Sequence, residues 1–162
     1  MLAEIPMVWS PCEPPDAVRE FAEEGLRRSK GIDCFDFVPS DYRTVYSVLA
    51  ALPRSSFCEW GSGMGIVTGL AAGLGFAACG IEIDATLAAA SRRLLQDFGL
   101  RARIETGDYL ACEPAADLFF VYCWPGETPR VEEHFCRAAP PRARLLVCHG
   151  AADLRLKAKA PA

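Results

Sequence analysis

Basic residues are outnumbered in this sequence: 17 lysines and arginines stand against 21 aspartates and glutamates, which gives a net charge of −4 at pH 7. Proteins that bind nucleic acids in general present a basic face. The deficit of positive charge therefore argues against a nucleic-acid partner. With 51% hydrophobic and 23% charged residues, the 162-residue chain has the composition of one globular unit.

Spaced cysteine pairs and a secretory leader are also missing. None of the eight cysteines belongs to a CxxC motif, and no basic segment followed by an apolar core opens the chain. These absences argue against a disulfide framework and against secretion. We therefore expect reduced cysteines, a cytoplasmic location and, because the cysteine and histidine spacing matches no zinc signature, no metal site.

The stretch from Trp60 to Ile81 has no charged residue and is long enough for a membrane span. Seven of its residues are glycines, however, and a β-like run at 56–59 leads directly into it. A strand, a tight glycine turn and a buried helix explain this composition better than a membrane-spanning helix. We expect no membrane span.

From residue 56 onward the pattern alternates between strand and helix. The apolar runs predict strands at 56–60, 77–82, 101–105, 117–123 and 144–149, and helices at 65–74, 86–98 and 129–137. Such alternation is typical of an α/β protein with a Rossmann-like, doubly wound and mostly parallel sheet. Ligands bind such sheets at the carboxyl ends of the strands.

The first forty residues contain five prolines and cannot form one long element. Between them we expect a helix at 16–30 with Asp16 as its N-cap, and a second helix from Ser40 to Pro53. We interpret residues 1–39 as a proline-rich, helical lid or brace, and residues 40–162 as the ligand-binding domain.

A glycine turn follows the first of the alternating strands. Gly61, Gly63 and Gly65 would let the backbone turn sharply and approach a ligand closely, and the helix behind them presents free amides. A dinucleotide-binding turn has the spacing GxGxxG, but its third glycine is replaced here by Ile66.

Two acids accompany the turn. Glu59 would repel a pyrophosphate, but it would suit S-adenosylmethionine, whose methionine end carries an ammonium and a carboxylate. Glu82, at the end of the next strand, could accept hydrogen bonds from ribose hydroxyls, and Ile83 could pack on a purine. After the third strand, Asp108 could accept from an adenine amino group and Tyr109 could lie along its ring, although a plain turn remains the alternative.

Gly65, Gly69 and Gly73 recur every four residues and form a stripe along one predicted helix. Each glycine costs about 1 kcal/mol relative to alanine in a helix. We expect close packing of this helix on the sheet to be the reason for the stripe.

These motifs resemble those of class I S-adenosylmethionine-dependent methyltransferases: residues 59–65, 80–84 and 107–109 occur in the expected order. Phe37-Val38-Pro39-Ser40, Gly61-Ser62-Gly63, Glu82, Leu87 and Ser91-Arg92 further resemble small seven-strand protein-lysine methyltransferases. The resemblance implies S-adenosylmethionine as cofactor. It implies cofactor contacts from Ser40, Glu59, Gly61, Ser62, Gly63, Gly65, Glu82, Ile83, Asp108, Tyr109 and Cys123.

The chain departs from this family in two places. Met64 and Ile66 stand where an acid and an arginine usually flank the last glycine. Thirteen residues follow His149, too few for the full antiparallel hairpin that usually completes the sheet. We expect part of this hairpin to be missing and the exposed edge to be covered by a second subunit, as in a homodimer.

In this fold the methyl acceptor lies near the end of the fourth strand. Trp124 could line the acceptor site and contact a cationic amine. Glu127 or His134 could accept the proton that a lysine must lose before attack. We take Trp124 and Glu127 as the candidate catalytic residues. Alternatively, Trp124 and Pro125 close a loop over the core.

The sequence thus favours a methyltransferase that uses S-adenosylmethionine, with a protein lysine preferred over a small molecule as acceptor. The NPPY and DPPY tetrads of amino-directed nucleic-acid methyltransferases are missing, so no nucleic acid is expected. A non-catalytic protein that binds S-adenosylmethionine is an alternative. Ile66 and Glu59 disfavour a nicotinamide-dependent oxidoreductase.

Overall fold

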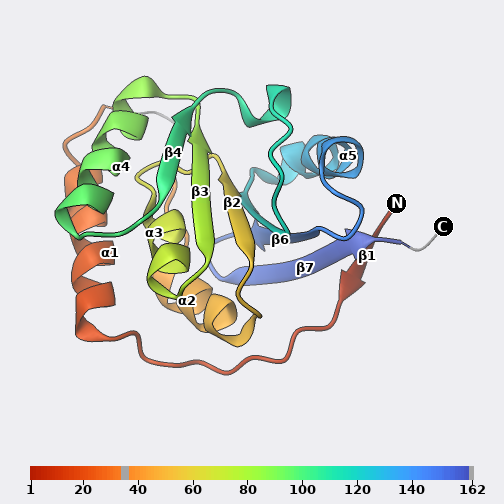
Figure 1. Ribbon diagram of the computed structural model, residues 1–162, viewed down its shortest axis with the longest axis horizontal. Coiled ribbons are helices and arrows are strands. Elements are labelled where there is room, and N and C mark those ends of the chain that lie inside the picture. The colour runs from red at the N-terminus through yellow and green to blue at the C-terminus, as the bar shows by residue number, and fades with distance from the viewer. Residues whose placement is uncertain (34–36, 161–162) are drawn as a thin grey trace.

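The computed structural model describes residues 1–33 and 37–160 (Figure 1). Its strands are β1 (Leu2–Ile5), β2 (Ser56–Trp60), β3 (Ala77–Glu82), β4 (Arg103–Thr106), β5 (Leu118–Tyr122), β6 (Arg144–His149) and β7 (Asp153–Lys159). Its helices are α1 (Asp16–Ser29), α2 (Tyr42–Ala51), α3 (Ile66–Gly73), α4 (Ala85–Asp97) and α5 (Thr128–Ala138), with short 3₁₀ turns η1 (Tyr109–Ala111) and η2 (Pro125–Glu127).

All seven strands form one sheet in the order β1-β7-β6-β5-β2-β3-β4. The five strands from β4 to β6 in this order are parallel, and β7 is antiparallel to both of its neighbours. The expected doubly wound, mostly parallel α/β sheet is therefore confirmed. Because β2 is flanked by β3 on one side and β5 on the other, the winding reverses between β2 and β5, which is where ligands bind in such folds.

Within the described residues a single strand, β7, follows β6, so the C-terminal part of the chain forms only half of the two-strand hairpin, as the sequence predicted. Residues of β7 pair with the whole of β6, from Arg144 opposite Ala158 to His149 opposite Asp153. On its far side β7 pairs with β1, so that Leu2 lies opposite Lys159. The chain's own N-terminal strand covers the edge that we had assigned to a second subunit, and this removes the reason for expecting a homodimer.

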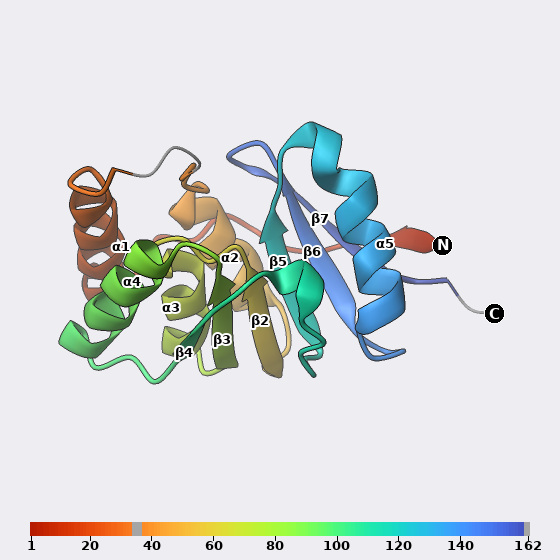
Figure 2. The ribbon, with the colours of Figure 1, turned by 90° about the horizontal axis from the view of Figure 1, so that it is seen from above.

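The two faces of the sheet bury separate apolar cores because successive strand residues point to opposite sides. Phe57 and Phe120 point to the face covered by α1–α4. Cys58, Trp60 and Phe119 point to the other face, where α5 lies over the half of the sheet that holds β5 and β6 (Figures 1 and 2). The helical layer on the first face positions the carboxyl ends of β2 and β3.

Residues 1–33 contribute to the core on the α1–α4 face. They supply β1 to the sheet and α1 to the helical layer, where Arg28 of α1 is 2.7 Å from Asp97 of α4. Helix α1 begins at Asp16, but Pro15 is its N-cap. Helix α2 begins two residues later than expected because Asp41 caps it, accepting a hydrogen bond from the Arg43 amide. The domain boundary at residue 39 stays a prediction.

The middle glycine of the stripe, Gly69, faces helix α1 and not the sheet. A Cβ on Gly69 would lie 2.1 Å from the ring of Phe21 on α1, whereas one on Gly73 would have its nearest neighbour, Leu100, at 3.8 Å. The packing reason that we expected therefore holds at Gly69, with α1 as the partner. Within the described ranges, no helix combines the length and apolar character that a membrane span needs.

Candidate functional site

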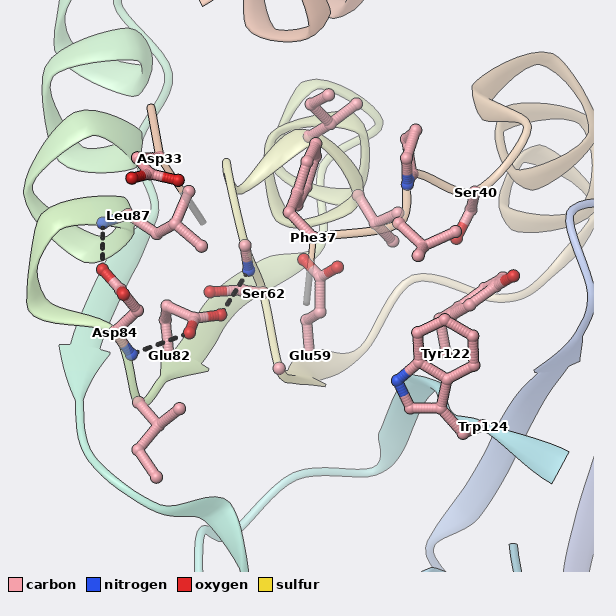
Figure 3. Close-up of a pocket in the computed structure, with 17 residues that line it drawn as sticks. Asp33, Phe37, Ser40, Glu59, Ser62, Glu82, Asp84, Leu87, Tyr122 and Trp124 are labelled. Atoms are coloured by element: carbon pink, nitrogen blue, oxygen red, sulfur yellow. Dashed lines mark hydrogen bonds between the residues drawn. The ribbon is translucent and has the colours of Figure 1, made fainter. Parts of the chain in front are cut away.

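A cavity of about 450 Å³ opens at the carboxyl ends of β2, β3 and β5, at the switch point of the sheet (Figure 3). Its walls come from the segment before α2, the glycine turn, the start of α3, the β3–α4 junction and the end of β5. The lining residues are Asp33, Phe37, Val38, Pro39, Ser40, Glu59, Gly61, Ser62, Gly63, Ile66, Val67, Glu82, Ile83, Asp84, Leu87, Tyr122 and Trp124.

The glycine turn between β2 and α3 needs its glycines. Gly61, Gly63 and Gly65 all have positive φ, at 71°, 52° and 71°, a backbone region that other residues rarely adopt. The amides of Gly61 and Ser62 both donate to the carbonyl of Ile81 on β3, at 2.9 and 3.0 Å. The turn is thereby fixed over the end of β3, and its backbone forms the cavity floor.

Glu59, at the end of β2, is buried beneath this turn with 5% of its surface exposed. Its Oε2 accepts hydrogen bonds from the amide of Thr68 at 2.8 Å and from the Thr68 hydroxyl at 2.5 Å. Burial raises the pKa of Glu59 to about 8, although the two hydrogen bonds from Thr68 act in the opposite direction. A carboxyl group of the protein therefore occupies the N-terminal turn of α3, where a dinucleotide fold binds its phosphates.

Glu82 is buried at the end of β3 and bridges two loops. Its Oε2 accepts from the amide of Gly63 at 2.6 Å and its Oε1 from the amide of Asp84 at 2.8 Å (Figure 3). An ionised carboxylate has about four acceptor positions, so both oxygens keep lone pairs for hydroxyl groups of a ligand. Asp84 is occupied as the N-cap of α4, accepting from the amides of Thr86 and Leu87.

Two aromatic walls flank the acids. Phe37 packs over the glycine turn so closely that a Cβ on Gly63 would lie 2.7 Å from its ring. Tyr122 and Trp124 form the opposite wall at the end of β5 (Figure 3). Trp124 is 54% exposed, so this wall continues to the cavity mouth.

The cavity is acidic. Asp33, Glu59, Glu82 and Asp84 contribute four carboxyl groups, and none of the described lining residues is a lysine, arginine or histidine. Ser62 adds a buried hydroxyl that has no hydrogen-bond partner within the described part of the chain. In the same ranges, no three histidine, cysteine, aspartate or glutamate side chains gather into a group that could hold a metal.

The structure brings most of the predicted site residues together. Ser40, Glu59, Gly61, Ser62, Gly63, Glu82, Ile83 and Trp124 all line the cavity. Gly65 lies beneath it as the N-cap of α3.

The remaining predicted residues lie outside the lining. Asp108 caps η1 by accepting from the Leu110 amide, and Tyr109 stacks on buried Trp60 with ring centroids 5.3 Å apart. The thiol of Cys123 is 3.4 Å from the Thr128 hydroxyl. Glu127 is half exposed and faces Arg130 at 3.4 Å. Their predicted roles stay predictions.

Two of the residues in and around the cavity that sequence reasoning missed are Thr68 and Tyr122. Thr68 gave no sequence signal because its contact with Glu59 depends on how α3 folds back over β2. Tyr122 could have been found from strand alternation, which sends the residues on either side of Cys123 toward the cavity.

Known protein-family models and curated protein sequences give no match to this chain. Several solved structures, in contrast, are similar to it. The chain is similar to a methyltransferase from Geobacter sulfurreducens, with 20% identity, 90% of this chain and 91% of that one covered, and a TM-score of 0.64. It is similar to an RNA methyltransferase from Salinibacter ruber in complex with S-adenosylhomocysteine, with 15% identity, coverages of 93% and 97%, and a TM-score of 0.58.

A third similar structure is the magnesium protoporphyrin IX methyltransferase of Synechocystis PCC 6803 with bound S-adenosylhomocysteine. It has 20% identity, coverages of 82% of this chain and 71% of that one, and a TM-score of 0.58. Together with the strand order, these likenesses show that the chain has the Rossmann-like fold of class I methyltransferases.

Proposed function

We propose that this protein is a methyltransferase that uses S-adenosylmethionine. The observation that carries the proposal is Glu59, whose carboxyl group occupies the N-terminal turn of α3 inside a cavity that has four carboxyl groups and, in its described lining, no basic residue. S-adenosylmethionine has a sulfonium, an ammonium and one carboxylate, so it is a net cation. The charge of the cavity favours such a ligand and opposes a nucleoside diphosphate.

The residues fit this cofactor group by group. Glu59 suits its ammonium, Glu82 suits the ribose hydroxyls, and Ile83, which is 70% exposed at the rim, suits one face of the adenine. The unpartnered hydroxyl of Ser62 leaves a donor for a polar ligand atom. Bound S-adenosylmethionine would supply an electrophilic methyl group. The chain's own residues would bind it, orient it and exclude water around it.

For the acceptor we propose the side-chain amine of a protein lysine, with a small molecule as the alternative. The wall of Tyr122 and Trp124 offers ring faces to a cation, and the carboxyl groups oppose an acceptor that carries phosphates. Of the two predicted catalytic residues, the geometry favours Trp124 because it lines the cavity mouth. One structurally similar protein acts on RNA, so RNA is included in the test.

Isothermal titration calorimetry of the whole chain tests the cofactor. We expect S-adenosylmethionine and S-adenosylhomocysteine to bind and NADH not to bind. Glu82→Ala and Glu82→Gln should each weaken binding by about tenfold or more, while Glu105→Ala, at an exposed position of β4, should leave it unchanged. Preferential binding of NADH would overturn the proposal.

A labelled methyl group then tests transfer. With S-adenosylmethionine labelled in its methyl group, we expect a lysate treated with the protein to gain label in its protein fraction, on lysine. Label in the small-molecule fraction supports the alternative acceptor. Label in RNA contradicts our acceptor proposal, and binding without transfer to any fraction identifies a non-catalytic protein.

A further inference from the structure

Thr68 directs both of its donors to one oxygen of Glu59. Its amide and its hydroxyl lie 2.8 and 2.5 Å from Oε2, and Thr68 is fully buried. Within the described residues, Oε1 of Glu59 accepts no hydrogen bond from the chain. Figure 3 shows this carboxylate pointing from the end of β2 into the cavity. One oxygen is therefore held by the protein, and the other remains for a ligand.

The position of Thr68 depends on a glycine in β3, Gly80, which has no side chain to occupy the space of the threonine hydroxyl. Gly80 pairs with Glu59 across the two strands, and a Cβ on Gly80 would lie 2.7 Å from the Thr68 hydroxyl and 2.6 Å from the Cβ of Ser62. The space above Gly80 is thus filled by Thr68 and Ser62. Three separate segments converge to bring the threonine hydroxyl to the acid.

We propose that Thr68 is a positioning residue for the cofactor: it fixes Glu59 so that its second oxygen accepts a hydrogen bond from the ammonium of S-adenosylmethionine. The inference rests on the proposed function. The ammonium requires an ionised Glu59, and donors to a carboxylate favour its ionised form. Thr68 therefore fixes the orientation of the Glu59 side chain and favours its ionised form.

The described part of the cavity lining has no lysine, arginine or histidine that could replace Thr68 in this role. The titratable groups that share the cavity with Glu59 are Glu82 at the end of β3, Tyr122 at the end of β5, Asp33 and Asp84. Burial raises the pKa of Glu59 and the charge of Glu82 raises it further, while the hydrogen bonds from Thr68 lower it. If the Thr68 hydroxyl is removed, Glu59 should keep its proton to a higher pH.

The test measures the affinity of the whole chain for S-adenosylhomocysteine by calorimetry from about pH 6 to about pH 9. This probe keeps the ammonium and cannot react. In the wild type, affinity should rise with pH as Glu59 ionises. Thr68→Val should weaken binding by about tenfold or more at neutral pH and move the rise to higher pH. Thr68→Ser should restore both the affinity and the pH profile.

Ser47→Ala is the matched control, because Ser47 is a buried helical residue whose hydroxyl bonds to the Arg43 carbonyl, in α2 and away from Glu59. It should leave the pH profile unchanged. Gly80→Ala, which would displace the Thr68 hydroxyl, should resemble Thr68→Val. Thr68→Ala replaces the valine variant if that variant does not fold.

The outcomes separate the two proposals. A wild type that does not bind S-adenosylhomocysteine overturns the proposed function and, with it, this inference. A wild type that binds, together with a folded Thr68→Val protein that has the same affinity and pH profile, overturns this inference alone. A loss of affinity without a shift of the pH profile assigns Thr68 a merely structural role.

Discussion

The surroundings of Glu59 act on its protonation in two opposite directions. Its surroundings exclude water, which favours the neutral acid, whereas Thr68 and the N-terminus of α3 favour the carboxylate. A ligand with an ammonium would settle this balance in favour of the charged form. Ligand binding and proton release are therefore linked at this residue.

This linkage predicts how the stability of the ligand-free protein depends on pH. The pKa of Glu59 is raised from 4.5 to about 8, so the folded state holds a proton that the unfolded state has lost. The contribution of Glu59 to stability is complete below pH 4.5 and is lost as the pH rises to about 8, by up to about 1.4 kcal/mol per pH unit.

Urea unfolding of the wild type and of Glu59→Gln over this pH range measures the effect. Glutamine keeps an acceptor for Thr68 but cannot ionise. As the pH rises, the unfolding free energy of the wild type should therefore fall relative to that of Glu59→Gln. Parallel curves for the two proteins would contradict the raised pKa.

Sequence reasoning located the acids of the site well and its loops less well. Glu59 and Glu82 could be predicted because each ends a buried strand, and the ends of adjacent parallel strands meet at one edge. Asp108 and Tyr109 could not be placed, because η1 turns the tyrosine ring onto Trp60. Cys123 was predicted to contact the cofactor, but its neighbours Tyr122 and Trp124 line the cavity and Cys123 does not.

Among the elements, the interior strands β2, β3 and β6 have the predicted bounds, because each is a mostly apolar run between turn residues. The two missed strands lie at or beside the sheet edge. β1 has four residues, and β7 alternates apolar and charged residues in a short segment that follows directly on β6. The alternation in β7 is a strand pattern that sequence reasoning overlooked, whereas the pairing of β1 with β7 joins opposite ends of the chain and has no local signal.

The crossing of α1 and α3 predicts opposite effects for two glycines of one helix. Gly69→Ala should destabilise the protein by about 1–3 kcal/mol, because its Cβ would overlap the ring of Phe21. Gly73→Ala, with its nearest neighbour at 3.8 Å, should be neutral or stabilise by up to about 1 kcal/mol. Chemical denaturation of both variants measures the difference, and equal effects would contradict the close crossing.

The edge strand β1 gives a second matched pair. Ile5 is half-buried against the core next to Leu156 of β7, whereas Val8 is 95% exposed. We expect Ile5→Asp to lower the free energy of unfolding by about 1–2 kcal/mol and Val8→Asp to change it by less than about 0.5 kcal/mol. If the two variants are equally stable in thermal unfolding, β1 does not contribute to the sheet.

At the scale of the whole molecule, residues 1–33 pack into the apolar core on the face of the sheet that α1–α4 cover. Tyr42 of α2 hydrogen-bonds to Glu23 of α1 at 3.2 Å, and α1 also pairs with α4 through Arg28 and Asp97. Small single-domain proteins usually unfold in one cooperative step. A brace that is part of this core should unfold with the sheet.

Hydrogen–deuterium exchange in increasing urea tests this expectation. The amides of α1 should become labelled at the same urea concentration as those of β2 and β5. Ligand-free protein is the appropriate sample, because a bound cofactor would stabilise the site selectively. Labelling of α1 at clearly lower urea concentration would instead indicate an independently opening segment and support a lid.

The pairing of β1 with β7 brings residues 2 and 159 next to each other at one edge of the sheet (Figure 2). A short linker could join these ends, and the chain could be reopened between β1 and α1 without breaking a strand pair. Such a circular permutant would carry its edge strand after β7 and keep the same sheet. The same geometry lets a fusion partner be attached at either terminus away from the cavity, which lies at the ends of β2, β3 and β5.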